Sequence, residues 1–235
     1  MKAKVLDYGL PTLALLFLGL GTFMGLIWAP PEKMMGDVYR IIYVHVPNAW
    51  VGLLACSINF VASVLYLVRD SWKADAMAEA SGEVGVLFAT LLIMTGSIWG
   101  RPTWGVWWTW DPRLTTAAIL LVAYAGYLAL RRFIDEPERR ATWSAVAAIL
   151  IAANIYVVWK AVDWWNTLHQ MRSSPSDMSP EMAWSLHANA WAFLLLYLTF
   201  LRFRYRLGRK RQQLELAPPP VSQTESQRLA TGESA

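Results

Sequence analysis

The sequence has few charged residues and almost no cysteine. Only 16% of its 235 residues are Asp, Glu, Lys or Arg, whereas 56% are hydrophobic. The one cysteine, Cys56, excludes an internal disulfide and any metal cluster built on several cysteines. So little charge is atypical of a soluble globular domain, and the hydrophobic residues occur in long runs rather than in amphipathic stripes. The composition therefore indicates an integral membrane protein.

The hydrophobic runs have the length of membrane-spanning helices. A helix needs about 20 mostly apolar residues to cross the hydrocarbon core. Six segments approach this length: residues 10–28, 46–68, 84–99, 114–130, 141–159 and 183–201. No ten-residue alternating pattern is present, so we expect spanning helices rather than spanning strands. No A-x-A-like cleavage site follows the first segment, so we expect a span there rather than a cleaved signal peptide. The sequence predicts an all-α membrane protein with six transmembrane helices.

The distribution of Lys and Arg predicts the orientation of these helices. With six spans both termini lie on one side, and that side carries 15 of the 21 basic residues. Cytoplasmic segments are enriched in Lys and Arg, so the N and C termini are predicted to be cytoplasmic. The basic residues are scattered and accompany no nucleic-acid-binding motif, so we do not expect nucleic acid as a partner.

Two parts of the chain differ in composition. Residues 1–214 contain all six hydrophobic segments and are predicted to form one membrane domain. Residues 215–235 are rich in Pro, Ser and Gln and are predicted to form a disordered cytoplasmic tail.

Tryptophans gather on the predicted outer side. The sequence WGVWWTWDPRLT begins at Trp104, between the third and fourth hydrophobic segments, and belongs to a predicted outer loop at about residues 99–115. On this topology twelve of the 14 tryptophans lie at or near the outer side, the exceptions being Trp72 and Trp143. Aromatic belts normally form at both membrane interfaces, so a belt alone predicts a more even division. The imbalance favours a flat aromatic ligand, with an interfacial belt as the alternative.

All three histidines lie on the same predicted side. His45 is expected to end the first outer loop, His169 to lie in the third, and His187 to lie near the start of the last span. Neutral imidazole is a common ligand of transition metals and of haem iron. His45 and His169 could therefore bind an iron porphyrin from its two faces. The alternative for each is an ordinary interfacial histidine, and we interpret His187 as structural or accessory.

Three charged residues accompany the tryptophans. Asp111 precedes Pro112 and a hydrophobic run, a pattern typical of a helix N-cap, although this does not exclude a role in a site. Arg101 and Arg113 flank the segment. Because guanidinium groups pair with carboxylates through two hydrogen bonds, these arginines could clamp the two propionates of haem.

The same residues carry a resemblance to a known family. WGVWWTWDPR fulfils every fixed position of the signature W-G-x-x-W-x-W-D-x-R found in haem-handling membrane proteins of cytochrome c biogenesis. Together with RIIYVHVP around His45 and WWNTLHQ around His169, it resembles the cytochrome c maturation protein C family, also called haem exporter protein C. The resemblance covers about residues 36–200.

The resemblance implies a function and a set of site residues. His45 and His169 are expected to be axial ligands of a transiently bound haem b at the periplasmic surface of the bacterial inner membrane. The signature residues are expected to contact haem and a periplasmic haem chaperone, protein E of the system, to which haem is covalently transferred; they are Trp104, Trp107, Trp108, Trp110 and Asp111. The expected partners also include the ABC transporter proteins A and B and a small membrane protein D.

Other functions remain open from the sequence. A b-type cytochrome with two histidine ligands would transfer electrons, but its histidines would usually lie inside facing spans. A subunit of a haem-exporting permease would usually carry ionisable residues or broken helices at mid-membrane. Here the spans offer mainly Asn59 and Asn154, which we interpret as contacts between helices. No nucleophile or acid–base pair is evident, so any enzymatic activity is at most an assisted haem attachment.

Overall fold

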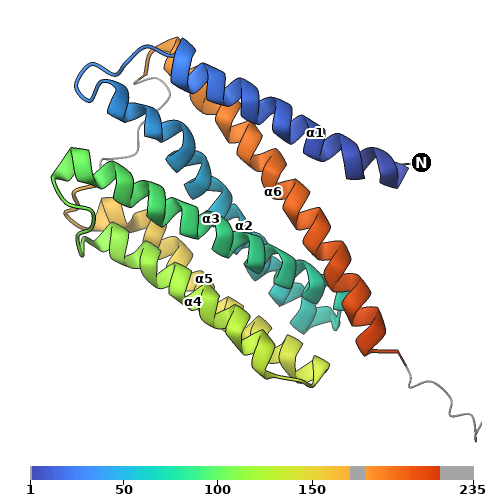
Figure 1. Cartoon of the computed structure of the whole chain (residues 1–235). Coiled ribbons are helices and arrows are strands. Elements are labelled where there is room, and N and C mark those ends of the chain that lie inside the picture. Colours follow the sequence, from blue (N-terminus) through green and yellow to red (C-terminus); the bar gives the residue numbers. More distant parts are fainter. Residues whose placement is uncertain (1, 170–177, 218–235) are drawn as a thin grey trace, which may run out of the picture.

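The computed structural model describes residues 2–169 and 178–217, and in these residues the chain is built from helices (Figure 1). The order is α1 (Lys2–Phe23), the π-helical turn η1 (Met24–Trp28), the 3₁₀ turn η2 (Asp37–Ile41), α2 (Ile42–Arg69), α3 (Trp72–Trp104), α4 (Pro112–Phe133), α5 (Pro137–Trp164) and α6 (Pro180–Glu215). Within the described ranges, six helices are long and apolar enough to cross a membrane. The predicted all-α fold with six spanning helices is confirmed.

The helices pack as neighbouring pairs. In Figure 1, α1 lies along α6, α2 along α3, and α4 along α5, and the same pairs are in contact. Contacts of α2 and α3 with both α6 and the α4–α5 pair make α2 and α3 the centre of the bundle. We call one end of the bundle the histidine end; it holds the loop Gly105–Asp111 and residues 165–169. The opposite end, which holds the start of α1 and the end of α6, is the charged end.

Several helices begin and end where the sequence supplies caps. Ser71, Asp111 and Ser179 each accept backbone N–H groups from the first turn of α3, α4 and α6. Proline occupies the start of α4, α5 and α6, where its missing N–H costs no helical hydrogen bond. Helix α3 ends at Gly105, whose φ of 80° is the left-handed conformation that glycine adopts without strain. The predicted capping role of Asp111 is confirmed.

The helices extend beyond the hydrophobic segments. The third segment was expected at residues 84–99, but α3 runs from Trp72 to Trp104; the sixth was expected at 183–201, but α6 continues to Glu215. The polar continuation of α6 is stabilised by ion pairs with other helices, including Arg202 with Asp7 of α1 at 2.9 Å and Arg204 with Glu83 of α3 at 2.5 Å. Most of the predicted tail lies outside the described residues, which end at 217.

Buried polar side chains join neighbouring helices inside the bundle. Asn59 of α2 donates to the carbonyl oxygen of Ala78 in α3 at 2.7 Å, and Asn154 of α5 donates to that of Thr116 in α4 at 2.9 Å. Both asparagines therefore act as the interhelical contacts predicted for them. Each satisfies a polar group that would be costly to leave unpaired in an apolar core.

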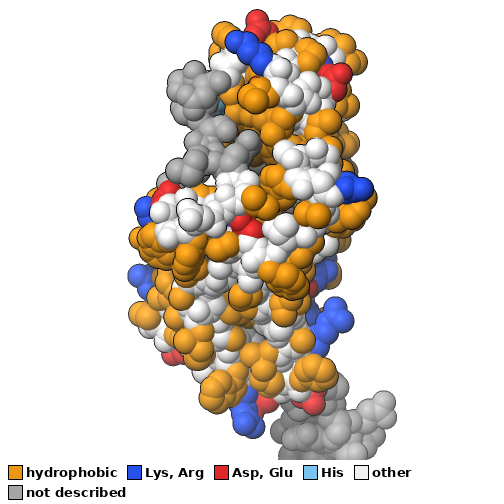
Figure 2. All heavy atoms as spheres, turned by 90° about the vertical axis from the view of Figure 1, so that its left-hand side faces the viewer, with side chains coloured by type: hydrophobic (Ala, Val, Ile, Leu, Met, Phe, Trp, Pro, Cys, Tyr) orange, Lys and Arg blue, Asp and Glu red, His pale blue; other side chains and the backbone are white. Residues whose placement is uncertain are grey.

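Hydrophobic side chains dominate the surface. Figure 2 shows one face on which they form large patches, with Lys, Arg, Asp and Glu side chains mostly at the two ends and along the margins. Large apolar residues are exposed on all six long helices, for example Leu15, Val61, Val122 and Leu150. A surface of this kind is stable when lipid rather than water surrounds it. The chain is a multi-pass membrane protein.

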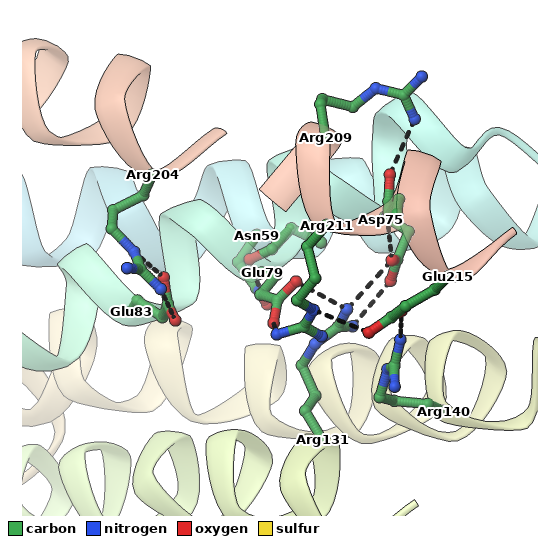
Figure 3. Close-up of polar contacts among 12 residues, drawn as sticks. Asn59, Asp75, Glu79, Glu83, Arg131, Arg140, Arg204, Arg209, Arg211 and Glu215 are labelled. Carbon is green, nitrogen blue, oxygen red and sulfur yellow. Dashed lines mark hydrogen bonds and ion pairs between the residues drawn. The ribbon is translucent and has the colours of Figure 1, made fainter. Parts of the chain in front are cut away.

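A network of charged side chains lies at the charged end of the bundle (Figure 3). Arg131 of α4 forms two hydrogen bonds with Asp75 of α3, at 2.7 and 3.0 Å, and one with Glu79 at 3.2 Å. Gln212 of α6 donates to Asp75 at 2.7 Å. We call the connected set the charged cluster; its members are Asp75, Glu79, Arg131, Arg140, Arg211, Gln212 and Glu215. It joins α3, α4, α5 and α6.

Candidate functional site

Two histidines that are remote in sequence meet at the histidine end. The ring centroids of His45 and His169 are 6.5 Å apart, and the ring planes are inclined by 35°. His169 lies in the segment that follows α5, as predicted. His45 does not end a loop: α2 begins at Ile42 and includes it. The 3₁₀ turn η2 leads directly into α2, so the outer connection is shorter than hydropathy predicted.

His45 is held by three residues of α3. Its Nδ1 atom lies 3.0 Å from the hydroxyl oxygen of Thr95. The ring of Trp99, one helical turn further along α3, packs edge-on against the imidazole at a centroid distance of 5.5 Å. Gly96 lies under the ring: a Cβ atom added to this glycine would stand 3.0 Å from His45 Cε1. One face of α3 therefore fixes the position of the imidazole.

His169 is held through its backbone and through Asp111. Asp111 caps α4 with Oδ1, which accepts from the N–H groups of Arg113 at 2.8 Å and Leu114 at 3.2 Å. Its other oxygen, Oδ2, accepts from the N–H of Leu168 at 2.7 Å. The N–H of His169 donates to the hydroxyl of Thr167 at 3.0 Å. Asp111 thus ties the tryptophan-rich loop to the residue that precedes His169.

The environment of Asp111 favours its ionised form. Burial opposes ionisation, but hydrogen bonds from Thr167 and from the backbone N–H groups of Leu168, Leu114 and Arg113 outweigh burial and lower the pKa of Asp111 below its usual range. The carboxylate is therefore charged at neutral pH, and its bond to Leu168 is charge-assisted.

The signature tryptophans do not share one environment. Trp107 and Trp110 are exposed by 59% and 80%, whereas Trp104 and Trp108 are partly buried. Trp104 lies on Gly100 of its own helix, and Trp108 and Trp110 pack edge-to-face at 5.8 Å. The hydroxyl of Ser97 donates to the carbonyl of Trp107 at 2.7 Å, which folds the loop back onto α3. The loop therefore presents two large aromatic surfaces outward.

The two flanking arginines each use at least one nitrogen within the protein. Arg101 donates to the carbonyl of Gly105, and Arg113 donates to the carbonyl of Val158 in α5 at 2.7 Å. Arg113 lies two residues after Asp111, whose carboxylate accepts from the N–H of Leu168 next to His169. A clamp for carboxylates remains a prediction for Arg101 and Arg113.

Several buried polar groups at the histidine end have no protein partner. Among the described residues, the buried indole N–H groups of Trp99 and Trp108 and the buried hydroxyls of Thr109 and Thr115 have no hydrogen-bond partner. Leaving a buried donor unpaired costs roughly 1–3 kcal/mol. These four groups are available for hydrogen bonds to a bound molecule or to water.

The residues fit haem better than a bare metal ion. No group of three or more His, Cys, Asp and Glu side chains able to hold a metal ion occurs in residues 2–169 and 178–217. Haem supplies four nitrogen ligands of its own, and two histidines, one on each face, complete a six-coordinate iron. Imidazole nitrogens bind metals at roughly 2 Å, so two rings flanking one iron atom have centroids roughly 6 Å apart. The observed 6.5 Å agrees with this spacing.

An open hollow lies beside His169. Residues 162–169 line this hollow of about 700 Å³, and His45 is not among its lining residues. The hollow leaves the surface beside His169 accessible.

His187 has a different setting. It lies on α6, is exposed, and its Nδ1 atom is 2.7 Å from the carbonyl oxygen of Ala183. Because a carbonyl oxygen only accepts, the ring donates this bond to its own helix. The structural interpretation of His187 is consistent with this contact.

Sequence reasoning missed the residues that support His45. Thr95 and Gly96 were counted only as part of a hydrophobic segment, and Trp99 only among the outer tryptophans, although Thr95 and Trp99 are spaced by four residues and so share one helix face. The four-residue spacing of Thr95 and Trp99 is visible in the sequence. It indicates a supporting surface for His45 only if the helix is expected to continue past Trp99 and to face His45.

Comparisons with known proteins show which proteins this chain is similar to. The family model described as "Heme exporter protein C" matches residues 2–217. Curated proteins of that name are similar to the chain. The protein from Bradyrhizobium diazoefficiens is 37% identical over 203 residues, which cover 85% of this chain and 76% of the relative. Those from Haemophilus influenzae and Escherichia coli are 35% and 32% identical; the matches cover 83% and 86% of this chain and 81% and 84% of the relatives.

Proposed function

Because the chain belongs to the haem exporter protein C family, a family that handles haem in cytochrome c biogenesis, we propose that His45 and His169 bind the iron of haem at the periplasmic surface of the inner membrane. The observation that supports this most directly is the pairing of the two imidazole rings at 6.5 Å. The family match does not depend on this distance, so the two arguments are independent.

The tryptophans and the unpaired polar groups suit the rest of a porphyrin. Trp107 and Trp110 offer exposed aromatic surface that would cover an apolar ring and exclude water from it. The N–H groups of Trp99 and Trp108 would complete their hydrogen bonds with ligand oxygens or bound water. Arg101 and Arg113 would contribute positive charge toward the propionates.

The proposed site favours transfer of haem to another protein. It lies at an end of the bundle, next to exposed side chains, and a ligand held there is accessible to a soluble partner. We propose that haem b is held transiently and passed to a periplasmic chaperone, protein E of the system, with Trp107 and Trp110 near the contact. The family name further points to an ABC transporter, for which proteins A and B and the small protein D are the proposed partners.

A b-type electron carrier is the second candidate. The position of His45 inside α2 favours it, because such proteins carry ligands on spanning helices. The second ligand, His169, lies beyond the end of α5 in an irregular segment, which favours exchange of haem over permanent retention. Reduction of the bound haem by a quinol and its reoxidation would distinguish the two functions.

The absorption spectrum of the purified protein tests the proposed function. Wild type, His45→Ala and His169→Ala are expressed with the chaperone but without the transporter ATPase, so that a haem complex accumulates. We expect a spectrum of haem with two histidine ligands in wild type and a weakened or shifted spectrum in both variants.

His187→Ala is the matched control, because it removes a histidine at the same end that bonds to its own helix. It is expected to retain the wild-type spectrum. Unaltered haem in both His45→Ala and His169→Ala would refute the ligand assignment, and a wild type without haem would leave the tryptophans as an interfacial belt.

A further inference from the structure

We propose that Thr95 is a positioning residue for His45: its hydroxyl oxygen accepts a hydrogen bond from Nδ1–H and thereby leaves Nε2 unprotonated as the nitrogen that binds iron. This inference rests on the proposed function, since it concerns how one proposed ligand is prepared. It concerns residues of α2 and α3 only.

The proton of the Thr95 hydroxyl already takes part in a hydrogen bond within α3. The Oγ1 atom lies 2.7 Å from the carbonyl oxygen of Leu91 and 3.2 Å from that of Leu92, one turn back along α3. Both are acceptors, and a hydroxyl carries one proton. At 2.7 Å two oxygens repel unless a proton lies between them, so the proton points toward Leu91.

The remaining contact of Thr95 fixes the tautomer of His45. With its proton directed at Leu91, Oγ1 can only accept at the 3.0 Å contact with His45 Nδ1. The imidazole therefore carries its proton on Nδ1, and the lone pair of the neutral ring is on Nε2. A histidine ligand is oriented in this way in many metal sites, where the second nitrogen donates to a protein acceptor.

Gly96 supplies the room that this arrangement needs. A Cβ atom at position 96 would lie 3.0 Å from Cε1 and 3.7 Å from Nδ1 of His45. The first distance is shorter than ordinary van der Waals contact, so an alanine here would displace the ring from Thr95. Thr95 and Gly96 thus act on the same edge of the imidazole. Thr95 accepts a hydrogen bond from it, and Gly96 leaves the space that the ring occupies.

The tautomer is measurable without haem. Histidine labelled with ¹⁵N is incorporated into the full chain, which has three histidines, and the spectrum is recorded at pH 8, with His169→Gln and His187→Gln used for assignment. Protonated and unprotonated ring nitrogens have well-separated chemical shifts. We expect His45 to carry the proton on Nδ1 in wild type and in Thr95→Ser, and to show a mixture of tautomers in Thr95→Val.

The haem-loaded protein provides the second readout. We expect Thr95→Val to lower haem affinity about 10- to 100-fold and to shift the reduction potential of the bound haem, as loss of an outer-shell partner does elsewhere. Thr95→Ser should restore both. Gly96→Ala should weaken binding, whereas Gly126→Ala, at a glycine of α4 with nothing within 4 Å of the added carbon, should not.

Thr90→Val is the matched control for folding. Thr90 is also on α3 and donates to a carbonyl of its own helix, that of Val86 at 2.8 Å, but has no such bond to His45. A wild-type His45 protonated on Nε2, or a Thr95→Val variant with wild-type tautomer, affinity and potential, overturns the proposal. If instead His45→Ala keeps its haem, the proposed function fails, and the ¹⁵N spectrum still decides whether Thr95 sets the tautomer.

Discussion

At the scale of single residues, Asp111 has two structural roles, one for each of its carboxylate oxygens. Its Oδ1 caps α4, while its Oδ2 holds the N–H of Leu168 at 2.7 Å, beside His169. An N-cap alone would accept Ser, Thr or Asn equally well. Only a carboxylate offers a second acceptor oxygen for the segment that follows α5. The sequence predicted the cap from Asp-Pro, but the second bond depends on a segment more than fifty residues away in the chain.

Asp111→Asn separates these two roles. The Asn oxygen can still cap α4, but its NH₂ group would face the N–H of Leu168, and two donors repel. We expect little change in thermal stability and a clear loss of bound haem, because the segment carrying His169 is released. Haem content and unfolding temperature, measured on the same detergent-purified sample, test this expectation.

Ser179→Ala gives the opposite pattern and is the control. Ser179 caps α6 by accepting from Met182 N–H, and its loss should cost about 1 kcal/mol of folding stability. Haem content should stay near wild type. If Asp111→Asn lost stability but kept haem, the bond to Leu168 would have no part in holding His169.

At the scale of elements, the charged cluster explains why helices extend beyond their hydrophobic segments. Three carboxylates, of Asp75, Glu79 and Glu215, meet three guanidinium groups, of Arg131, Arg140 and Arg211. The members come from four helices, so each polar helix end is stabilised by the others. Hydropathy along one segment cannot show this, because the partners lie in other segments. Hydropathy along the chain therefore predicts the six spans, but it does not predict where the helices end.

Arg131→Ala tests the contribution of the charged cluster. The side chains of Arg131 and Asp75 are exposed by only 3% and 5%, so removing the arginine leaves Asp75 and Glu79 buried beside an empty space. Breaking a buried ion pair on one side typically costs about 3–5 kcal/mol. We expect a large fall in unfolding temperature in detergent and no change in the spectrum of any haem that remains bound.

Arg139→Ala is the matched control at the same end. Arg139 pairs with Glu136 at 3.6 Å, and both side chains are exposed, by 70% and 54%. Exposed pairs contribute at most about 1 kcal/mol, so the unfolding temperature should hardly change. Equal effects of the two substitutions would contradict a structural role of the buried network.

At the scale of the whole molecule, the two ends of the bundle are built differently. The charged end holds a network of buried ion pairs, whereas the histidine end brings His45 and His169 together and exposes Trp107 and Trp110. An ionic end and an aromatic end suit a protein that presents a ligand on one side of a membrane. The sequence predicted the excess of tryptophan on one side, but the pairing of unlike ends required the fold.

Single-cysteine labelling tests the predicted orientation. The native Cys56 is buried, with 2% of its surface exposed, and should resist a membrane-impermeant maleimide. Met34→Cys, at a position 93% exposed between η1 and η2, should be labelled from the outside of intact cells. Asp135→Cys, between α4 and α5, should be labelled only after the membrane is permeabilised. The reverse pattern would place the histidines on the cytoplasmic side.

Several of the arginines that predict this orientation lie in ion pairs once the protein has folded. Arg131, Arg140, Arg202, Arg204, Arg206 and Arg211 all lie in ion pairs. We infer that, during biosynthesis and before their partners are in place, these side chains act as topological signals, to which acidic residues contribute little. On this inference the same side chains serve at two different times, first in insertion and later in assembly. Loss of Asp75 should leave insertion into the membrane unchanged and impair assembly of the helices, whereas loss of an arginine should affect both steps.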